Sequence, residues 1–178
     1  DKSFEFARSL EDLFHGKSSG VDVVGVMMDE PMHYRIGDPP ETFDIHWKPH
    51  LYLSYCNSNS ITVKGVTSTE KLWRNNPDRA QALHDTMNES VNMAQTSLGC
   101  DADEGYLKLL ESLKKAHHCF NEWGLIENAL LDHISALHKH GAAIAKPTGS
   151  GGGGGHVLSL WEKEPPKDLP FELMPLLP

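Results

Sequence analysis

The sequence predicts an α+β fold, an antiparallel sheet with helices packed on one face. Two observations favour it. The middle of the chain, about 67–140, carries apolar residues at helical spacing in several consecutive segments. Short apolar or alternating runs typical of strands lie on both sides of this helical block. Strands and helices mixed in this way indicate an α+β sandwich with a mainly antiparallel sheet.

The first third of the chain predicts one helix and several strands. Apolar residues from Phe4 to Phe14 recur at helical spacing, and Gly16 is placed to end that helix. The run from Val21 to Met28 is apolar and rich in β-branched residues, which favours a buried strand. Further strands are predicted over 31–36 and 50–56, separated by a loop at 37–40.

The remainder predicts four helices, and then strands. Thr67 and Glu70 form a capping-box pattern that begins the first helix, after a polar loop over 57–65. The predicted helices span 67–75, 77–98, 103–123 and 127–140, the last two closed by Gly124 and Gly141. The predicted strands span 142–147 and 155–161, with an edge strand at 171–174.

Composition limits the function classes. The chain has 178 residues, 39% of them hydrophobic, which is enough for a globular core. Its net charge of −9 argues against a nucleic-acid partner. It has no apolar run near the length of a membrane span, so no membrane partner is expected. Cys56, Cys100 and Cys119 lack metal-ligand spacing and are typical of free thiols in the cytoplasm.

The stretch from Ala145 to Gly155 reads AKPTGSGGGGG and lies between two strand-like runs. Glycine has no Cβ, so the backbone N–H groups of such a run can approach an anion closely. The alternative is a flexible linker. Against a linker stand the short length of the run, the Lys-Pro-Thr that leads into it and the strand-like segment that follows at once.

A second motif lies near the start, where residues 11–22 read EDLFHGKSSGVD. Together the two motifs resemble the GHMP small-molecule kinases, and most closely the mevalonate kinases among them. That family carries Glu, three residues, His-Gly, two residues, Ser-Gly, one residue and Asp. Near its C-terminus it carries Lys-x-Thr-Gly-Ala-Gly-Gly-Gly-Gly before a strand. Both patterns occur here in the same order.

The resemblance implies an ATP:alcohol phosphotransferase with ATP and Mg²⁺ as cofactors, acting on mevalonate in isoprenoid precursor synthesis. Asp22 would be the catalytic carboxylate, and Glu11 would be linked to the metal. Substrate or phosphate would be bound by seven residues: Gly16, Ser19, Gly20, Thr148, Gly149, Gly151 and Gly152. From the residue alone, Asp22 is better explained as the cap of a turn, and only the whole motif favours catalysis. Lys146 could be an exposed strand charge.

The family also has a loop, Pro-x3-Gly-Leu-Gly-Ser-Ser, upstream of the first motif, and no such string occurs here. The chain is therefore expected to be the C-terminal portion of a longer kinase, inactive alone. Residues 1–45 would be a remnant of the N-terminal domain that carries the first motif. Residues 46–178 would be the ferredoxin-like C-terminal domain.

Two departures from the family pattern leave the substrate open. Ser18 stands where the family usually has Pro, and Val23 stands where it usually has Asn. The alternatives are another GHMP kinase, acting on phosphomevalonate, a sugar or homoserine, and a non-catalytic binding domain. The expected partners are ATP and a small-molecule substrate, with a homodimer left open.

Overall fold

The computed structural model describes residues 2–15, 19–58, 62–149 and 155–177. The chain divides into two compact units, residues 1–45 and 46–178, here called unit 1 and unit 2. Each is described by itself. The division falls between Ile45 and His46. Whether the units are the remnant and the C-terminal domain of a kinase stays a prediction.

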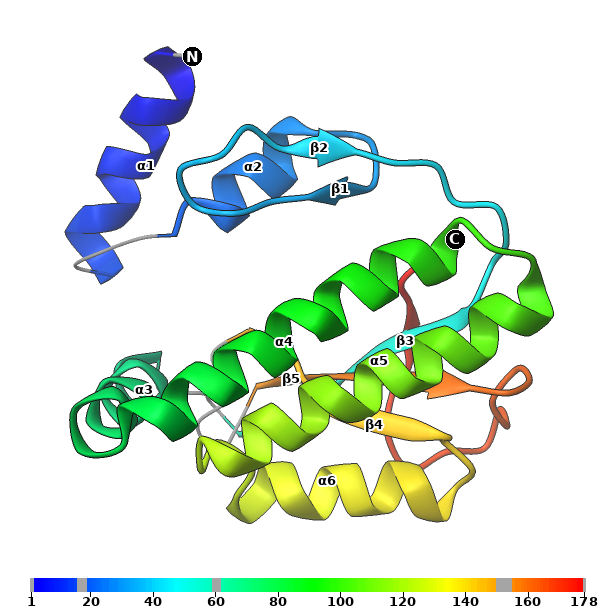
Figure 1. The fold of residues 1–178 in the computed structure, drawn as a ribbon. Coiled ribbons are helices and arrows are strands. Elements are labelled where there is room, and N and C mark those ends of the chain that lie inside the picture. Colours follow the sequence, from blue (N-terminus) through cyan, green and yellow to red (C-terminus); the bar gives the residue numbers. More distant parts are fainter. Residues whose placement is uncertain (1, 16–18, 59–61, 150–154, 178) are drawn as a thin grey trace. The chain divides into compact units, whose positions relative to one another are not determined.

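Unit 1 contains two helices and one small hairpin. Helix α1 spans Lys2–His15 and α2 spans Val21–Met27. The two-residue strands β1 (Met32–His33) and β2 (Glu41–Thr42) pair antiparallel, with Met32 opposite Thr42. Figure 1 shows these elements in blue and cyan.

The strand predicted over 21–28 is wrong, because this segment is helix α2. The burial pattern has the spacing of a helix: the adjacent residues Val23 and Val24 are both buried, while Val21 and Val26 are exposed. A strand would send neighbouring side chains to opposite faces. Gly20 begins the helix in a left-handed conformation, and the Val24 N–H donates to its carbonyl.

Unit 2 is an antiparallel four-stranded sheet with four helices, α3 (Thr62–Asn75), α4 (Pro77–Leu98), α5 (Ala102–Glu122) and α6 (Asn128–Lys139). Its strands are β3 (His50–Tyr55), β4 (Ile144–Pro147), β5 (His156–Trp161) and β6 (Met174–Pro175). The spatial order is β4-β5-β3-β6, and every pair is antiparallel. Read from β6, the order is β6-β3-β5-β4, which is the fourth, first, third and second strand of unit 2 in chain order. This is the strand order of a ferredoxin-like sheet. The α+β prediction is confirmed.

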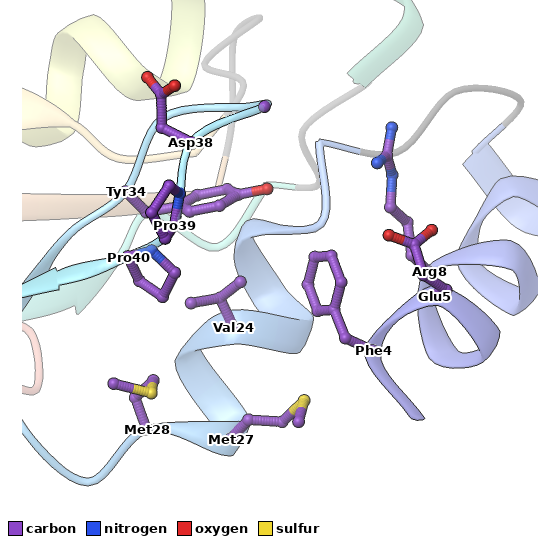
Figure 2. A pocket seen from close by; sticks show the side chains of 11 residues that line it. Phe4, Glu5, Arg8, Val24, Met27, Met28, Tyr34, Asp38, Pro39 and Pro40 are labelled. Atoms are coloured by element: carbon purple, nitrogen blue, oxygen red, sulfur yellow. The ribbon is translucent and has the colours of Figure 1, made fainter. Parts of the chain in front are cut away.

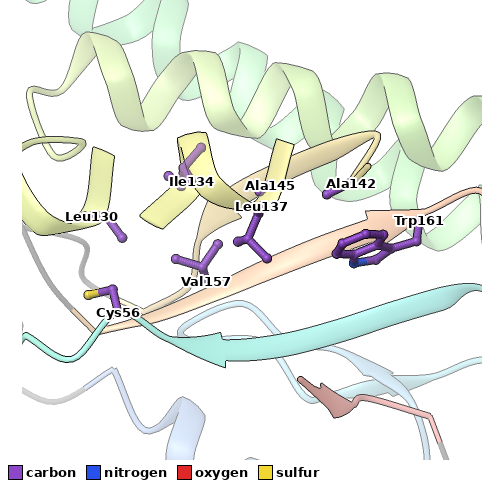
Figure 3. Packing of buried hydrophobic residues seen from close by; sticks show 8 residues of the cluster. All are labelled: Cys56, Leu130, Ile134, Leu137, Ala142, Ala145, Val157 and Trp161. Carbon is purple, nitrogen blue, oxygen red and sulfur yellow. The ribbon is translucent and has the colours of Figure 1, made fainter. Parts of the chain in front are cut away.

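Both faces of this sheet are covered, which corrects the prediction of helices on one face. Leu51 and Leu160 pair across β3 and β5 and pack against α5. Val157 and Trp161, at alternate positions of β5, point the other way and pack against α6. Figure 3 shows Leu130, Ile134 and Leu137 of α6 facing Val157. A strand with apolar residues on both faces needs a layer on each.

The long helices begin and end near their predicted residues. Asn76 caps α4 by accepting from the Arg79 N–H, and Asp101 caps α5 by accepting from the Glu104 N–H. Gly124 and Gly141 follow α5 and α6 with positive φ, as a helix-ending glycine does. Figure 1 shows α4 and α5 side by side.

Two predicted boundaries are wrong. Helix α3 begins at Thr62, so Thr67 lies inside the helix and does not mark its start. The Thr69 hydroxyl inside α3 donates to the Gly65 and Val66 carbonyls, the usual arrangement for a hydroxyl in a helix. The C-terminal edge strand lies at Met174–Pro175, later than predicted, and pairs with β3.

Candidate active site

The turn before Asp22 is built around Gly20. Gly20 has φ +76°, a left-handed conformation that glycine adopts without strain. A Cβ at this position would lie 3.1 Å from Phe4 Cζ and 3.4 Å from Tyr34 Oη. Two features therefore favour glycine here: the left-handed backbone angle, and the tight contacts that a Cβ would make with Phe4 and Tyr34. This accounts for the predicted Gly20 on structural grounds.

Ser19 contributes to the same turn through side chain and backbone. Its hydroxyl oxygen accepts a 3.3 Å hydrogen bond from the Val21 N–H. Its carbonyl accepts a 2.9 Å hydrogen bond from the Tyr34 hydroxyl. The turn is thus tied to the segment that follows β1. Tyr34 was not predicted from the sequence as a site residue.

Asp22 lies in the first turn of α2, and its side chain is exposed. A carboxylate in the first turn interacts favourably with the helix dipole. The next residue, Val23, is buried in unit 1 and anchors the helix. Asp22 therefore projects from a fixed backbone into solvent, where a ligand has access to it. Glu11 is half-buried on α1, so both predicted acids lie in unit 1.

A cavity of about 410 Å³ lies beside this turn, within unit 1. Figure 2 shows Phe4 and Arg8 of α1 on one side of it and Val24 and Met27 of α2 nearby. Phe4, Arg8 and Tyr34 are also the side chains nearest to Gly20. The cavity is mostly apolar, with the charged groups of Arg8, Glu5 and Asp38 at its wall. The helical spacing of Phe4 and Arg8 is the one sequence signal that points to this shared face.

The second predicted motif begins in unit 2, at the end of β4. The Thr148 N–H donates a 3.0 Å hydrogen bond to the His156 carbonyl, which continues the β4–β5 ladder by one residue. Gly149 follows with φ +71°, and no atom lies within 4 Å of where its Cβ would be. Thr148 is half-buried and Gly149 is exposed. The β4–β5 ladder is thus followed by a left-handed glycine, the last residue described before the gap at 150–154.

Four of the residues singled out from the sequence, Gly16, Ser18, Gly151 and Gly152, lie outside the described residues. The two motifs belong to different units.

Lys146 is not the exposed strand charge that one interpretation of the sequence suggested. Its side chain is half-buried, with Nζ 2.6 Å from the Pro147 carbonyl oxygen and 5.0 Å from the centre of the Phe120 ring. Burial lowers its pKa from 10.5 to about 8. Nearby, His117 Nδ1 lies 2.9 Å from the Ala145 carbonyl oxygen. Burial lowers the pKa of His117, and this hydrogen bond partly opposes the shift.

Two further properties of the described residues bear on the expected partners. No group of three or more His, Cys, Asp or Glu side chains is arranged to hold a metal ion in the part that the structure describes. Over the same residues, no helix has the length and apolar character needed to cross a membrane. The Cys56 and Cys119 thiols are buried, and Cys100 is partly exposed.

The chain is similar to known mevalonate kinases. It is 24% identical to mevalonate kinase of Pyrococcus abyssi over 152 residues, which is 84% of this chain and 45% of that protein. It is 25% identical to mevalonate kinase of Pyrococcus horikoshii over 154 residues, again 84% and 45%. The chain thus spans about half the length of the curated relatives it matches. No family model matches it.

Two solved structures share its fold. The crystal structure of L. major mevalonate kinase in complex with R-mevalonate superposes with a TM-score of 0.66 at 20% identity, covering 84% of this chain and 46% of that one. The crystal structure of a Lin0012 protein from Listeria innocua gives a TM-score of 0.66 at 16% identity, covering 97% and 59%. Sequence similarity and shared fold together confirm the resemblance of this chain to the GHMP kinases, and to the mevalonate kinases in particular.

Proposed function

We propose that this chain is the C-terminal portion of a kinase that transfers the terminal phosphoryl group of ATP to the hydroxyl group of a small metabolite, mevalonate being the first choice. One observation carries the proposal. A chain similar to mevalonate kinases over 84% of its length carries both family motifs, in family order. The chain spans 45% of those relatives, so the activity belongs to the longer protein.

Asp22 has the properties that the proposed role requires. Phosphoryl transfer to an alcohol needs the hydroxyl group held in line with the phosphate and its proton accepted. The exposed Asp22 carboxylate stands on a helix whose start is fixed by Gly20 and by the buried Val23 and Val24. A carboxylate held in this way can orient a hydroxyl group and accept its proton.

Glu11 fits the Mg²⁺ that the family uses. Mg²⁺ takes one or two protein carboxylates, and its other ligands are water and substrate phosphate. A single half-buried glutamate suits this pattern better than a closed protein cage, and the described residues form no such cage. When bound, Mg²⁺ would neutralise charge on the ATP phosphates. In unit 2, Thr148 would offer a hydroxyl group and Gly149 a backbone N–H to substrate or phosphate.

A second substrate class within the same reaction rests on Val23. The family usually has Asn after its catalytic Asp, and here the position holds a buried valine. Valine offers no amide group for hydrogen bonding. This keeps open a substrate other than mevalonate, such as phosphomevalonate, a sugar or homoserine.

The test is a substrate panel on the longer protein that contains this chain. Purified protein with Mg²⁺-ATP is offered mevalonate, phosphomevalonate, galactose and homoserine, and the phosphorylated product is identified by phosphorus NMR. We expect turnover with one substrate and none from residues 1–178 alone. Absence of turnover with every alcohol would favour the non-catalytic binding domain. Turnover by residues 1–178 alone would contradict the proposal that activity requires the family loop upstream of the first motif.

A further inference from the structure

Strand β4 lies at the edge of the sheet and leads directly into the second motif. Because the Thr148 N–H bonds to the His156 carbonyl, these two residues form a hydrogen-bonded pair of the antiparallel ladder. Pro147 and Ala145 then occupy positions whose backbone groups point away from β5. Their carbonyls therefore face the open edge of the sheet.

Both outward carbonyls have a side-chain partner. His117 Nδ1 lies 2.9 Å from the Ala145 oxygen, and Lys146 Nζ donates to the Pro147 oxygen at 2.6 Å. Pro147 has no N–H of its own, so the outward edge has no donor at that residue. The carbonyl that Lys146 binds belongs to the last residue of β4, one peptide bond before Thr148.

Lys146 is a costly residue for this position. Its ammonium group is half-buried against the Phe120 ring, and within the described residues no carboxylate forms an ion pair with it. A partly buried cation without a counter-ion is destabilising, and an apolar side chain of similar length would pack there at lower cost. A lysine at such a site is better explained by a local task than by stability.

We propose that Lys146 is a positioning residue for Thr148. Its ammonium group holds the carbonyl end of the Pro147–Thr148 peptide, while the Thr148 N–H holds the other end on His156. The peptide is thereby fixed on both sides, and it sets the direction in which the Thr148 side chain and the Gly149 backbone leave the sheet. This inference rests on the proposed function, in which Thr148 contacts substrate or phosphate.

The geometry explains why one peptide matters. Beyond it, Gly149 has a left-handed backbone, with open space around its Cβ position. Among the described residues, apart from the chain neighbours, no atom packs at the Gly149 Cβ position to limit a rotation of the preceding peptide. A displacement of about 1 Å at a group that orients a reacting phosphate costs on the order of 10²-fold in rate.

The test compares three variants of the kinase that contains this chain. Lys146→Met removes the ammonium group and keeps the side-chain length. Lys146→Arg keeps a donor and the charge. Lys139→Met, at an exposed lysine near the end of α6, is the matched control. Each variant is assayed for kcat, KM and Tm, and for the hydrogen–deuterium exchange rate of the Thr148 amide.

We expect Lys146→Met to lower kcat by at least about 10-fold with KM changed less than about 3-fold, because a transition-state contact is misplaced. The same variant should raise Tm, because a half-buried charge without a counter-ion is removed. The Thr148 amide should exchange about 10-fold faster, since its peptide has lost one anchor. Lys146→Arg should recover most of kcat, and Lys139→Met should change none of these values.

The outcomes separate this inference from the proposed function. If the unmodified kinase phosphorylates no alcohol, the proposed function is wrong, and the Thr148 exchange rate alone then decides whether Lys146 holds the peptide. If the kinase is active, kcat and exchange must change together. A Lys146→Met variant with an unchanged exchange rate, or with faster exchange and normal kcat, overturns the positioning role. A lower kcat with a lower Tm would also overturn it, as general loss of structure.

Discussion

The hydroxyl group of Tyr34 donates a 2.9 Å hydrogen bond to the carbonyl of Ser19, fifteen positions earlier in the chain. The bond joins the segment after β1 to the turn that precedes Asp22. A Cβ at Gly20, the next residue of that turn, would be crowded by Phe4 at 3.1 Å and Tyr34 at 3.4 Å. The direction of α2, and with it the direction of Asp22, therefore depends on packing inside unit 1.

Gly20→Ala should destabilise unit 1 by about 1–2 kcal/mol, because alanine is strained at a left-handed φ and its Cβ would press on Phe4. Gly25→Ala is the matched control. Gly25 lies inside α2 with open space around it, so alanine should be neutral or stabilise the helix by up to about 1 kcal/mol. The measurement is the exchange rate of the Val24 amide, which donates to the Gly20 carbonyl. Equal effects of the two variants would contradict the role of Gly20.

Asp22→Ala in the longer kinase should lower kcat by at least about 10²-fold and leave the fold intact, because the side chain is exposed and its proposed task is proton transfer. The comparison is Asp29→Ala, which removes another exposed acid from unit 1 and should leave kcat unchanged. Circular dichroism confirms folding of both. Near-normal turnover of Asp22→Ala would show that Asp22 is not catalytic and is only an acidic residue in the first turn of α2.

Gly105→Ala should destabilise unit 2 by about 3 kcal/mol, the upper end of the range for overpacked sites. A Cβ at Gly105 would lie 2.7 Å from the Ser97 carbonyl oxygen and 2.6 Å from Trp47 Cε2. Trp47 Nε1 donates to that same carbonyl, so neither neighbour can move freely. Gly99→Ala, at the end of α4 with its nearest contact at 3.7 Å, should cost little. Urea unfolding followed by tryptophan fluorescence distinguishes the two, and similar midpoints would refute the close packing.

Stability should rise with pH in two windows. Burial lowers the pKa of His117 and of His133 from 6.5, so below this value the unfolded chain binds protons that the folded chain does not. Stability therefore falls as pH drops below about 6.5. Lys146 should raise the free energy of unfolding a second time, between pH values of about 8 and 10.5. In this range the Lys146 side chain is protonated in the unfolded chain and neutral in the folded one.

Urea unfolding across the acidic window tests the first part. His117→Gln with His133→Gln should flatten the dependence, whereas His118→Gln, at the exposed neighbour, should not. Lys146→Met should remove the alkaline rise. An unfolding free energy that increases on acidification would contradict the assignment.

The long helices of unit 2 could be predicted because their signals are local. Pro77 at the start of α4 and Gly124 after α5 mark boundaries that tertiary packing does not override. The run 21–28 could not be assigned correctly, because its six hydrophobic residues fit a buried strand as well as a helix. The helix begins at Gly20, and the left-handed conformation of Gly20 and its contacts with Phe4 and Tyr34 are visible only in the structure.

The candidate site could be predicted from motif residues but not from their surroundings. The motifs identify Asp22, Ser19, Gly20 and Thr148, yet they give no sign that Tyr34 binds the Ser19 carbonyl. Lys146 lies inside the second motif, but its half-buried state follows from Phe120 on α5, which is remote in sequence. Residues that hold a motif in place come from wherever the fold brings a side chain near.

The division into two units determines which unit tryptophan fluorescence reports on. All four tryptophans, Trp47, Trp73, Trp123 and Trp161, belong to unit 2, and unit 1 has Tyr34 as its only tyrosine. Tryptophan emission therefore follows the melting of unit 2 alone. A single tryptophan introduced on unit 1, at the exposed Phe6, would give that unit a signal of its own and show whether the two melt together.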